Sequence, residues 1–289
     1  MKKSELSNDK ISVVIATIGG DLLQKTISKL NQGSITPSEI IIIIPSDKVS
    51  RIKDLSFHNT KIIATSFSGQ VKQRLEGFRR AKYDYVIQLD DDILMHHNSI
   101  EYLLDSLNKL GPGNVIGPSM YDSDSQLCMN KFDLGLLGLF KSLNAFLLSG
   151  APWGLQRMGK ITSIGLPFGI DPNLCSIGEN KVDFLTGGCV ISFKEDLIIE
   201  DFFPYSGKAY SEDVIHSLIR KSKGIKHYIN TKAIAHTRLD NLPFKWVDFK
   251  AELKVKFYIL KLIRGNKLKL LFWLISQIPT RFFRQNFKI

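Results

Sequence analysis

Two continuous apolar runs near the N-terminus constrain the fold most, Ile11 to Ala16 (ISVVIA) and Glu39 to Ile44 (EIIIII). β-Branched runs without polar alternation are typical of strands buried on both faces, and such strands form parallel sheets. The pattern of strand, loop and helix then recurs along the chain. The sequence therefore predicts an α/β fold with a mostly parallel sheet flanked by helices.

The same reasoning assigns the other elements. We expect further strands at 61–65, 85–89, 115–120, 182–185 and 189–193, short strands near His227 and Ala233, and helices at 21–31, 69–82, 98–110 and 212–223. The pattern breaks down between about Ser123 and Lys181, where the apolar stretch Phe132 to Gly150 is compatible with a buried or a membrane-contacting helix.

The net charge of +11 is concentrated at the C-terminal end of the chain. From Lys245 to Ile289 there are eleven Lys or Arg and two acidic residues, a net charge of +9, which leaves +2 for the other residues. This asymmetry argues against a nucleic-acid-binding protein. The basic residues alternate with aromatic ones, which predicts an amphipathic helical tail over 241–289 that contacts an anionic membrane surface. Packing on the rest of the chain or a homodimer interface is the alternative.

The cysteines and the N-terminus predict a cytoplasmic protein, which the basic tail would hold at the inner face of the membrane. Cys128, Cys175 and Cys189 are few and lack a metal-binding spacing, which favours a reducing compartment. The N-terminus does not resemble a signal peptide. The apolar stretch Leu268 to Ile278 is too short for a spanning helix and contains Lys269.

Three consecutive carboxylates, Asp90, Asp91 and Asp92, follow the expected strand at 85–89. In parallel sheets, ligands bind at the carboxyl ends of strands. Adjacent carboxylates repel one another, and a hard cation such as Mn²⁺ or Mg²⁺ would offset this repulsion and bind substrate phosphates. An exposed turn or a helix N-terminus is the alternative explanation.

Three segments in the same order resemble glycosyltransferase family 2. The segment Gly69 to Ile93 (GQVKQRLEGFRRAKYDYVIQLDDDI) is similar to the stretch that leads into the family's Asp-X-Asp motif. Val182 to Ile198 (VDFLTGGCVISFKEDLI) is similar to its acceptor-side segment, and Ser211-Glu212-Asp213 to its Glu-Asp motif. The resemblance implies a GT-A fold over 1–240, with a nucleotide-sugar half at about 1–120 and an acceptor half at about 121–240.

The resemblance also implies a role for each site residue. Asp213 would be the catalytic base of an inverting transfer, with Glu212 beside it. Metal ligands would be Asp90, Asp92 and His236, the last in the segment AIAHTRL. The residues expected at the nucleotide-sugar are Thr17, Asp47, Arg74, Asp90, Asp91, Gly187 and Gly188. After the second strand the chain reads Ile44-Pro45-Ser46-Asp47, which departs from the Asp-Asp-Gly-Ser common in the family.

These observations predict a metal-dependent enzyme. It would move a sugar from a nucleoside-diphosphate sugar, most simply a UDP-sugar, to a saccharide or lipid-linked acceptor in bacterial-type surface polysaccharide synthesis. A nucleotidyltransferase is one alternative, although the loop Ile18 to Asp21 lacks the basic residue of a phosphate loop. A non-catalytic nucleotide-binding or membrane scaffold protein is the other.

Overall fold

The computed structural model describes residues 10–205, 209–238 and 246–286 and divides into two compact units. Unit 1 comprises Met1–Met129 and Pro172–Leu242, and unit 2 comprises Asn130–Asp171 and Pro243–Ile289. This division differs from the expected boundaries of 1–240 and 241–289, because residues 130–171 group with the C-terminal helices. Within unit 2, Ile164 packs against Leu260 and Leu270, which accounts for the grouping.

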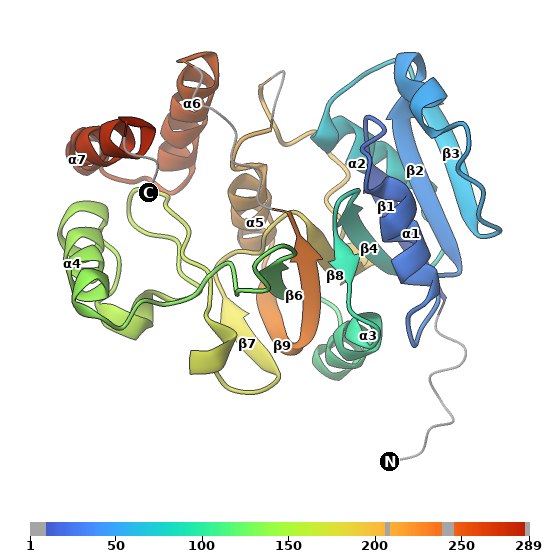
Figure 1. Ribbon diagram of the computed structural model, residues 1–289, viewed down its shortest axis with the longest axis horizontal. Coiled ribbons are helices and arrows are strands. Elements are labelled where there is room, and N and C mark those ends of the chain that lie inside the picture. Colours follow the sequence, from blue (N-terminus) through green and yellow to red (C-terminus); the bar gives the residue numbers. More distant parts are fainter. Residues whose placement is uncertain (1–9, 206–208, 239–245, 287–289) are drawn as a thin grey trace. The chain divides into compact units, whose positions relative to one another are not determined.

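Unit 1 is built on a sheet with nine strands among the described residues, in the order β3-β2-β1-β4-β8-β6-β9-β5, with β7 paired to β9 (Figure 1). Its strands are β1 (Ile11–Ala16), β2 (Glu39–Pro45), β3 (Thr60–Thr65), β4 (Tyr85–Asp90), β5 (Leu94–Met95), β6 (Asn114–Asp122), β7 (Glu179–Val182), β8 (Cys189–Phe193) and β9 (Lys226–Thr237). Its helices are α1 (Leu23–Asn31), the 3₁₀ helix η2 (Ser46–Ile52), α2 (Gln70–Arg80), α3 (Ser99–Leu110) and α5 (Glu212–Ser222), with the short 3₁₀ turns η5 (Pro172–Leu174) and η6 (Lys194–Asp196).

Helices cover both faces of the sheet (Figure 1). Buried side chains of α1 and α3 pack on alternate residues of β1, including Val13 and Ile15, in one large core. On the other face, Gly77 of α2 lies against Val14 and Ile43. A side chain at Gly77 would overlap Val14, so glycine is what allows α2 to approach the sheet closely.

The expected parallel arrangement holds for β3, β2, β1 and β4, which all pair in parallel. Beyond β4 the sheet is mixed, because β8 pairs antiparallel with both β4 and β6. The last strands also differ from the sequence prediction. β7 lies at 179–182 rather than 182–185, and the two short strands expected near His227 and Ala233 are one strand, β9.

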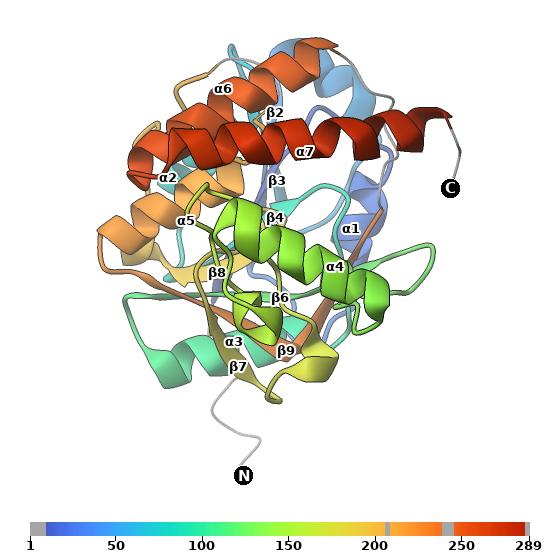
Figure 2. The ribbon, with the colours of Figure 1, turned by 90° about the vertical axis from the view of Figure 1, so that its left-hand side faces the viewer.

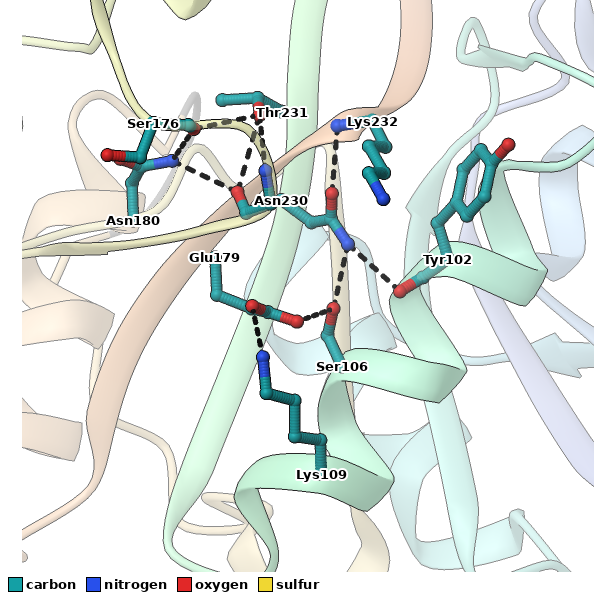
Figure 3. Close-up of polar contacts among 10 residues, drawn as sticks. Tyr102, Ser106, Lys109, Ser176, Glu179, Asn180, Asn230, Thr231 and Lys232 are labelled. Atoms are coloured by element: carbon teal, nitrogen blue, oxygen red, sulfur yellow. Dashed lines mark hydrogen bonds and ion pairs between the residues drawn. The ribbon is translucent and has the colours of Figure 1, made fainter. Parts of the chain in front are cut away.

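Strand β9 carries a register shift against β6 after Asn230, where the pairing moves between Pro118 and Ser119. A polar network surrounds this irregularity (Figure 3). The Asn230 side-chain amide donates to the Tyr102 carbonyl at 3.0 Å and to Ser106 Oγ at 2.7 Å, while its oxygen accepts from the Lys232 amide. The network satisfies buried polar groups that a bulge would otherwise leave unpaired.

Unit 2 contains helices from both of its segments (Figure 2). They are α4 (Leu136–Asn144), the π-helical turn η3 (Ala145–Ser149), the 3₁₀ turn η4 (Gly154–Arg157), α6 (Trp246–Leu262) and α7 (Lys267–Asn286). A small apolar core joins Ile164, Leu260 of α6 and Leu270 of α7. Among the described residues, no helix combines the length and apolar character needed to cross a bilayer.

Candidate functional site

The three consecutive aspartates lie where the parallel strands β1 and β4 end, with Ala16 beside Asp90 in the register. Each carboxylate has a different partner. Asp90 Oδ1 accepts from Gln70 Nε2 at 3.2 Å, Asp91 Oδ2 accepts from the Thr17 hydroxyl, and Asp92 Oδ2 accepts from Thr237 Oγ1 at 3.0 Å. The chain therefore directs three negative groups toward three separate donors at one edge of the sheet.

Burial and mutual repulsion act on these carboxylates. Desolvation raises the pKa of Asp91 and of Asp92, and the negative charge of Asp90 adds to the increase in both. Hydrogen bonds from Thr17 and Thr237 oppose the shift. A cation would stabilise the ionised forms, which is the electrostatic condition expected of a metal or diphosphate site.

Arg74 of α2 joins the aspartates to the start of α5. Its side chain is only 3% exposed, and it pairs with Asp90 Oδ1 through Nη2 at 2.5 Å and with Glu212 Oε1 through Nη1. Burial alone would lower the pKa of the guanidinium, but the charges of Asp90 and Glu212 raise it overall. Arg74 is thus a fixed cation that holds carboxylates from two distant segments together.

Gly187 lies against this ion pair, in the loop that precedes β8. A Cβ at this position would overlap Glu212 Oε1 and would lie 3.3 Å from Arg74 Nη1. The Gly187 carbonyl accepts from Gln88 Nε2 at 2.5 Å, and the next carbonyl, of Gly188, accepts from the Asp90 amide at 2.8 Å. The glycine pair therefore lets the backbone approach the charged cluster. Glycine is needed here because the packing is close, and not because the backbone makes a turn.

Glu212 and Asp213 form the first turn of α5, after Ser211 in a left-handed conformation with φ of 49°. Such a conformation in a residue other than glycine is uncommon and often marks a functional position. Desolvation, followed by the charge of Glu212, raises the pKa of Asp213 to about 7. A carboxylate with this pKa can accept a proton at neutral pH, as a general base must.

The loop after β1 closes the site beside Asp91. Thr17 Oγ1 accepts from the Gly19 amide at 2.8 Å while its hydroxyl donates to Asp91. Arg51 of η2 donates to the Ile18 carbonyl at 3.3 Å, so the segment after β2 lies next to this loop. Asp47, at the start of η2, is exposed and pairs with Lys48 at 2.9 Å. Its expected contact with a nucleotide stays a prediction.

The predicted metal ligand His236 lies near the end of β9, next to Thr237. Because side chains alternate along a strand, the contact of Thr237 with Asp92 directs the neighbouring His236 to the other face of β9. His236 instead packs against Tyr121 and lines a cavity of about 420 Å³ with His96 and His97. Burial and the charge of His96 lower its pKa. The expectation that His236 completes a metal site gains no support from this arrangement.

The donors around the aspartate turn decide whether a metal ion fits there. Within residues 10–205, 209–238 and 246–286, no three His, Cys, Asp or Glu side chains converge in a group that could hold a metal. The carboxylates of Asp90 and Asp92 are nevertheless hard oxygen donors on one short turn. Mg²⁺ and similar ions are commonly bound by one or two carboxylates, water and substrate phosphates. The donor set fits that mode of binding and not a closed, all-protein cage.

Several polar atoms near the site are buried without a hydrogen-bond partner among the described residues. They include Arg74 Nε, Glu212 Oε2, Gln88 Oε1 and, one turn further along α5, His216 Nε2. Buried polar groups are usually satisfied, and unsatisfied ones at a site point to a missing ligand or water. The arrangement can bind an anion-bearing substrate at the aspartate turn through a cation and remove a proton at Asp213.

Sequence reasoning found Thr17, Arg74, Glu212 and the glycine pair, and the structure places them in contact with one another or with the aspartates. It missed Gln70, Gln88 and Thr237. The two glutamines lie inside segments that were matched only through their charged and glycine positions. For Gln88 a signal was present, because a buried strand such as β4 rarely contains a polar residue without a partner.

Comparisons with known proteins agree with this geometry. The family model described as Glycosyl transferase family 2 matches residues 12–147. A solved structure titled "Crystal structure of GalNAc-T7 with UDP, GalNAc and Mn2+" is similar, with a TM-score of 0.56 and 15% sequence identity. The similarity covers 85% of this chain and 47% of that one, so the chain spans about half its length. No curated protein matches the chain.

Proposed function

We propose that the chain is a family 2 glycosyltransferase, as the family-model match over residues 12–147 supports, and that it transfers a sugar from a UDP-sugar to a saccharide or lipid-linked saccharide. The observation that carries the proposal is the ion-pair cluster of Asp90, Arg74 and Glu212. It joins the aspartate turn, where a diphosphate would bind, to the acidic start of α5, where an acceptor hydroxyl would lose its proton. A GT-A fold, shared with the UDP- and Mn²⁺-bound GalNAc-T7, supports the same assignment.

The proposed reaction assigns proton removal to Asp213 and binding of the diphosphate to the aspartate turn. The acceptor hydroxyl donates its proton to the Asp213 carboxylate while its oxygen attacks the anomeric carbon of the donor. The bond from that carbon to the diphosphate oxygen breaks, and the nucleoside diphosphate departs with the electron pair. Attack opposite the leaving group inverts the anomeric configuration. Arg74 holds Glu212 in place beside the base through their ion pair.

The aspartate turn would hold Mn²⁺ or Mg²⁺ through Asp90 and Asp92, with substrate phosphate oxygens as further ligands. Bound there, the ion would neutralise charge on the departing diphosphate. Thr17 orients Asp91 through its hydroxyl, and Thr237 orients Asp92. Gly187 and Gly188 leave room for the donor or acceptor sugar at the backbone.

Two alternatives are less well supported. A nucleotidyltransferase would need cations aligned on the loop after β1, but that loop is ordered around Asp91, with Arg51 turned to the Ile18 carbonyl. A scaffold protein without catalysis would have no need for Asp213, whose pKa of about 7 suits a base. The biological setting that we propose is bacterial-type surface polysaccharide synthesis at the cytoplasmic face of a membrane.

The test is release of nucleoside diphosphate from a panel of UDP-, GDP- and dTDP-sugars with Mn²⁺, with Mg²⁺ or with chelator. Asp92→Ala and Asp213→Asn are compared with Asp54→Ala, which changes an exposed carboxylate after η2. We expect metal-dependent release that both site variants reduce at least 100-fold and the control leaves unchanged. Undiminished release by Asp92→Ala and Asp213→Asn would refute the site assignment. No release from any donor, with lipid extracts as acceptors, would favour the scaffold.

A further inference from the structure

The continuous segment of α4 and η3, residues 136–149, has its apolar side facing outward. Six of its large apolar side chains are 42–78% exposed: Leu136, Leu139, Phe140, Leu143, Phe146 and Leu147. Leu148 is half-buried, and the buried positions among the described side chains of the segment are small or polar, namely Gly138, Ser142, Ala145 and Ser149. A helix on a water-soluble surface normally shows the opposite distribution, with its apolar stripe facing the core.

The contacts beneath this segment explain its orientation. Ser142 Oγ accepts from Arg157 Nη1 at 2.5 Å. The Arg157 guanidinium in turn lies 4.4 Å from the ring centroid of Phe132 and 5.2 Å from that of Phe168. A buried cation between aromatic rings thus occupies the place where an apolar core would otherwise sit. The inward side of α4 therefore makes a polar contact, and its large apolar side chains lie on the exposed side.

Helix α7 repeats the feature. Leu268, Leu271, Phe272 and Ile275 recur at the spacing of one helical face and are 52–67% exposed, whereas Leu270 is fully buried in the small core of unit 2. Helix α7 packs against η3, and α4 and α7 lie side by side in unit 2 (Figures 1 and 2). Exposed apolar stripes on two such helices are of the kind that marks a protein or membrane contact.

The distribution of charge between the two units favours an anionic lipid bilayer as the partner. Unit 2 contains 15 Lys or Arg and 4 Asp or Glu, a net charge of +11, which leaves 24 basic and 24 acidic residues in unit 1. All of the net charge of the chain therefore lies in the unit with the outward apolar stripes. Lys141 on α4 and Lys267 and Lys269 on α7 are exposed beside the stripes. Apolar stripes flanked by cations complement a bilayer that contains anionic lipids.

We propose that unit 2 docks on an anionic lipid bilayer, with α4–η3 and α7 lying in the interface and their apolar stripes among the acyl chains. The docking surface thus includes an internal segment as well as the basic C-terminal tail, and it does not depend on the reaction catalysed by unit 1. A second copy of the chain is a poorer partner, because two surfaces of this charge repel each other. α4–η3 is too short to span a bilayer.

Co-sedimentation with vesicles tests the proposal on the full chain. Phosphatidylcholine vesicles with and without 30% phosphatidylglycerol are compared for wild type, Leu136→Ser/Phe140→Ser and Lys267→Glu/Lys269→Glu. We expect binding to the anionic vesicles that each double variant weakens at least tenfold. The matched control is Ile177→Ser, which removes an apolar side chain that is 83% exposed in unit 1. It should bind as wild type does.

Tryptophan fluorescence provides a second readout, because all three Trp residues, Trp153, Trp246 and Trp273, lie in unit 2. Brominated lipids should quench wild type and not the Leu136→Ser/Phe140→Ser variant. Unchanged vesicle binding by that variant would overturn the proposal. So would a dimer in light scattering that this variant converts to a monomer, since the stripes would then cover a second copy. Retained donor turnover shows that the variants are folded.

Discussion

Replacing Arg74 by Met tests whether the ion-pair cluster holds the site together. The guanidinium is 3% exposed and Glu212 is 7% exposed, so the substitution would leave a buried carboxylate without its partner. Breaking a buried pair from one side costs about 3–5 kcal/mol of unfolding free energy. The partial exposure of Asp90, 24%, lets water compensate there and leaves most of the loss with Glu212.

The same helix provides a matched control. Arg80 pairs with Glu76 at 2.6 Å, but its side chain is 48% exposed. Exposed pairs contribute about 0–1 kcal/mol, so Arg80→Met should be nearly neutral. With an m-value of about 2 kcal/mol per molar urea, the Arg74 variant should unfold at a midpoint lower by about 1.5–2.5 M.

Urea unfolding followed by far-UV circular dichroism measures the difference, and tryptophan fluorescence reports unit 2 separately. The variant Glu212→Gln with Arg74→Met should recover part of the stability, because the uncompensated charge is then removed. If Arg74→Met costs no more than Arg80→Met, the cluster does not contribute what its burial implies, and the reasoning is refuted.

Three further predictions concern single positions. Gly187→Ala should cost about 1–3 kcal/mol and reduce turnover, because its Cβ overlaps Glu212. For Gly188→Ala the nearest atom is Ile93 Cδ1 at 3.1 Å, so this variant should lose less stability in thermal melts. The pKa of Asp213 is raised to about 7 in the folded protein, so the neutral carboxyl favours folding. The free energy of unfolding should therefore fall as pH rises from about 4 to 7, and Asp213→Asn should remove this dependence. Turnover should rise from about pH 6 to about pH 8, with a midpoint near 7, because the base must be ionised. Thr237→Val should raise the metal concentration needed for half-maximal turnover several-fold, because Asp92 loses its hydroxyl donor; an unchanged metal requirement would count against that role.

Local sequence patterns were sufficient for much of unit 1. The runs at 11–16 and 189–193 are strands with the expected bounds, and α5 begins at Glu212 as expected. Strong β-branched runs and acidic helix starts depend little on distant contacts. β7 was misplaced because its position depends on pairing with β9 rather than on its own residues. Within the stretch 123–181, the helix considered for Phe132 to Gly150 corresponds to α4 and η3. The rest of that stretch could not be assigned from the sequence.

Part of the site could be predicted from residue types and their order in the sequence. Three aspartates after an apolar run and an Arg on the preceding helix are signals that a sequence shows directly, whereas the burial of that Arg is seen only in the structure. The contact of Thr237 with Asp92 could not be predicted, because it depends on which face of β9 is turned to Asp92. A shift of one residue along a strand exchanges the two faces, and no local signal fixes it.

The most direct test of the central claim is calorimetric binding of UDP, because it does not require the acceptor to be known. UDP is titrated into wild type and into the variant Asp90→Asn/Asp92→Asn, each in the presence of Mn²⁺ and in the presence of chelator. The account predicts that UDP binds wild type at least 30-fold more tightly with Mn²⁺ and that the variant loses this enhancement. Binding that is equally tight with chelator, or an enhancement that survives in the variant, would contradict it.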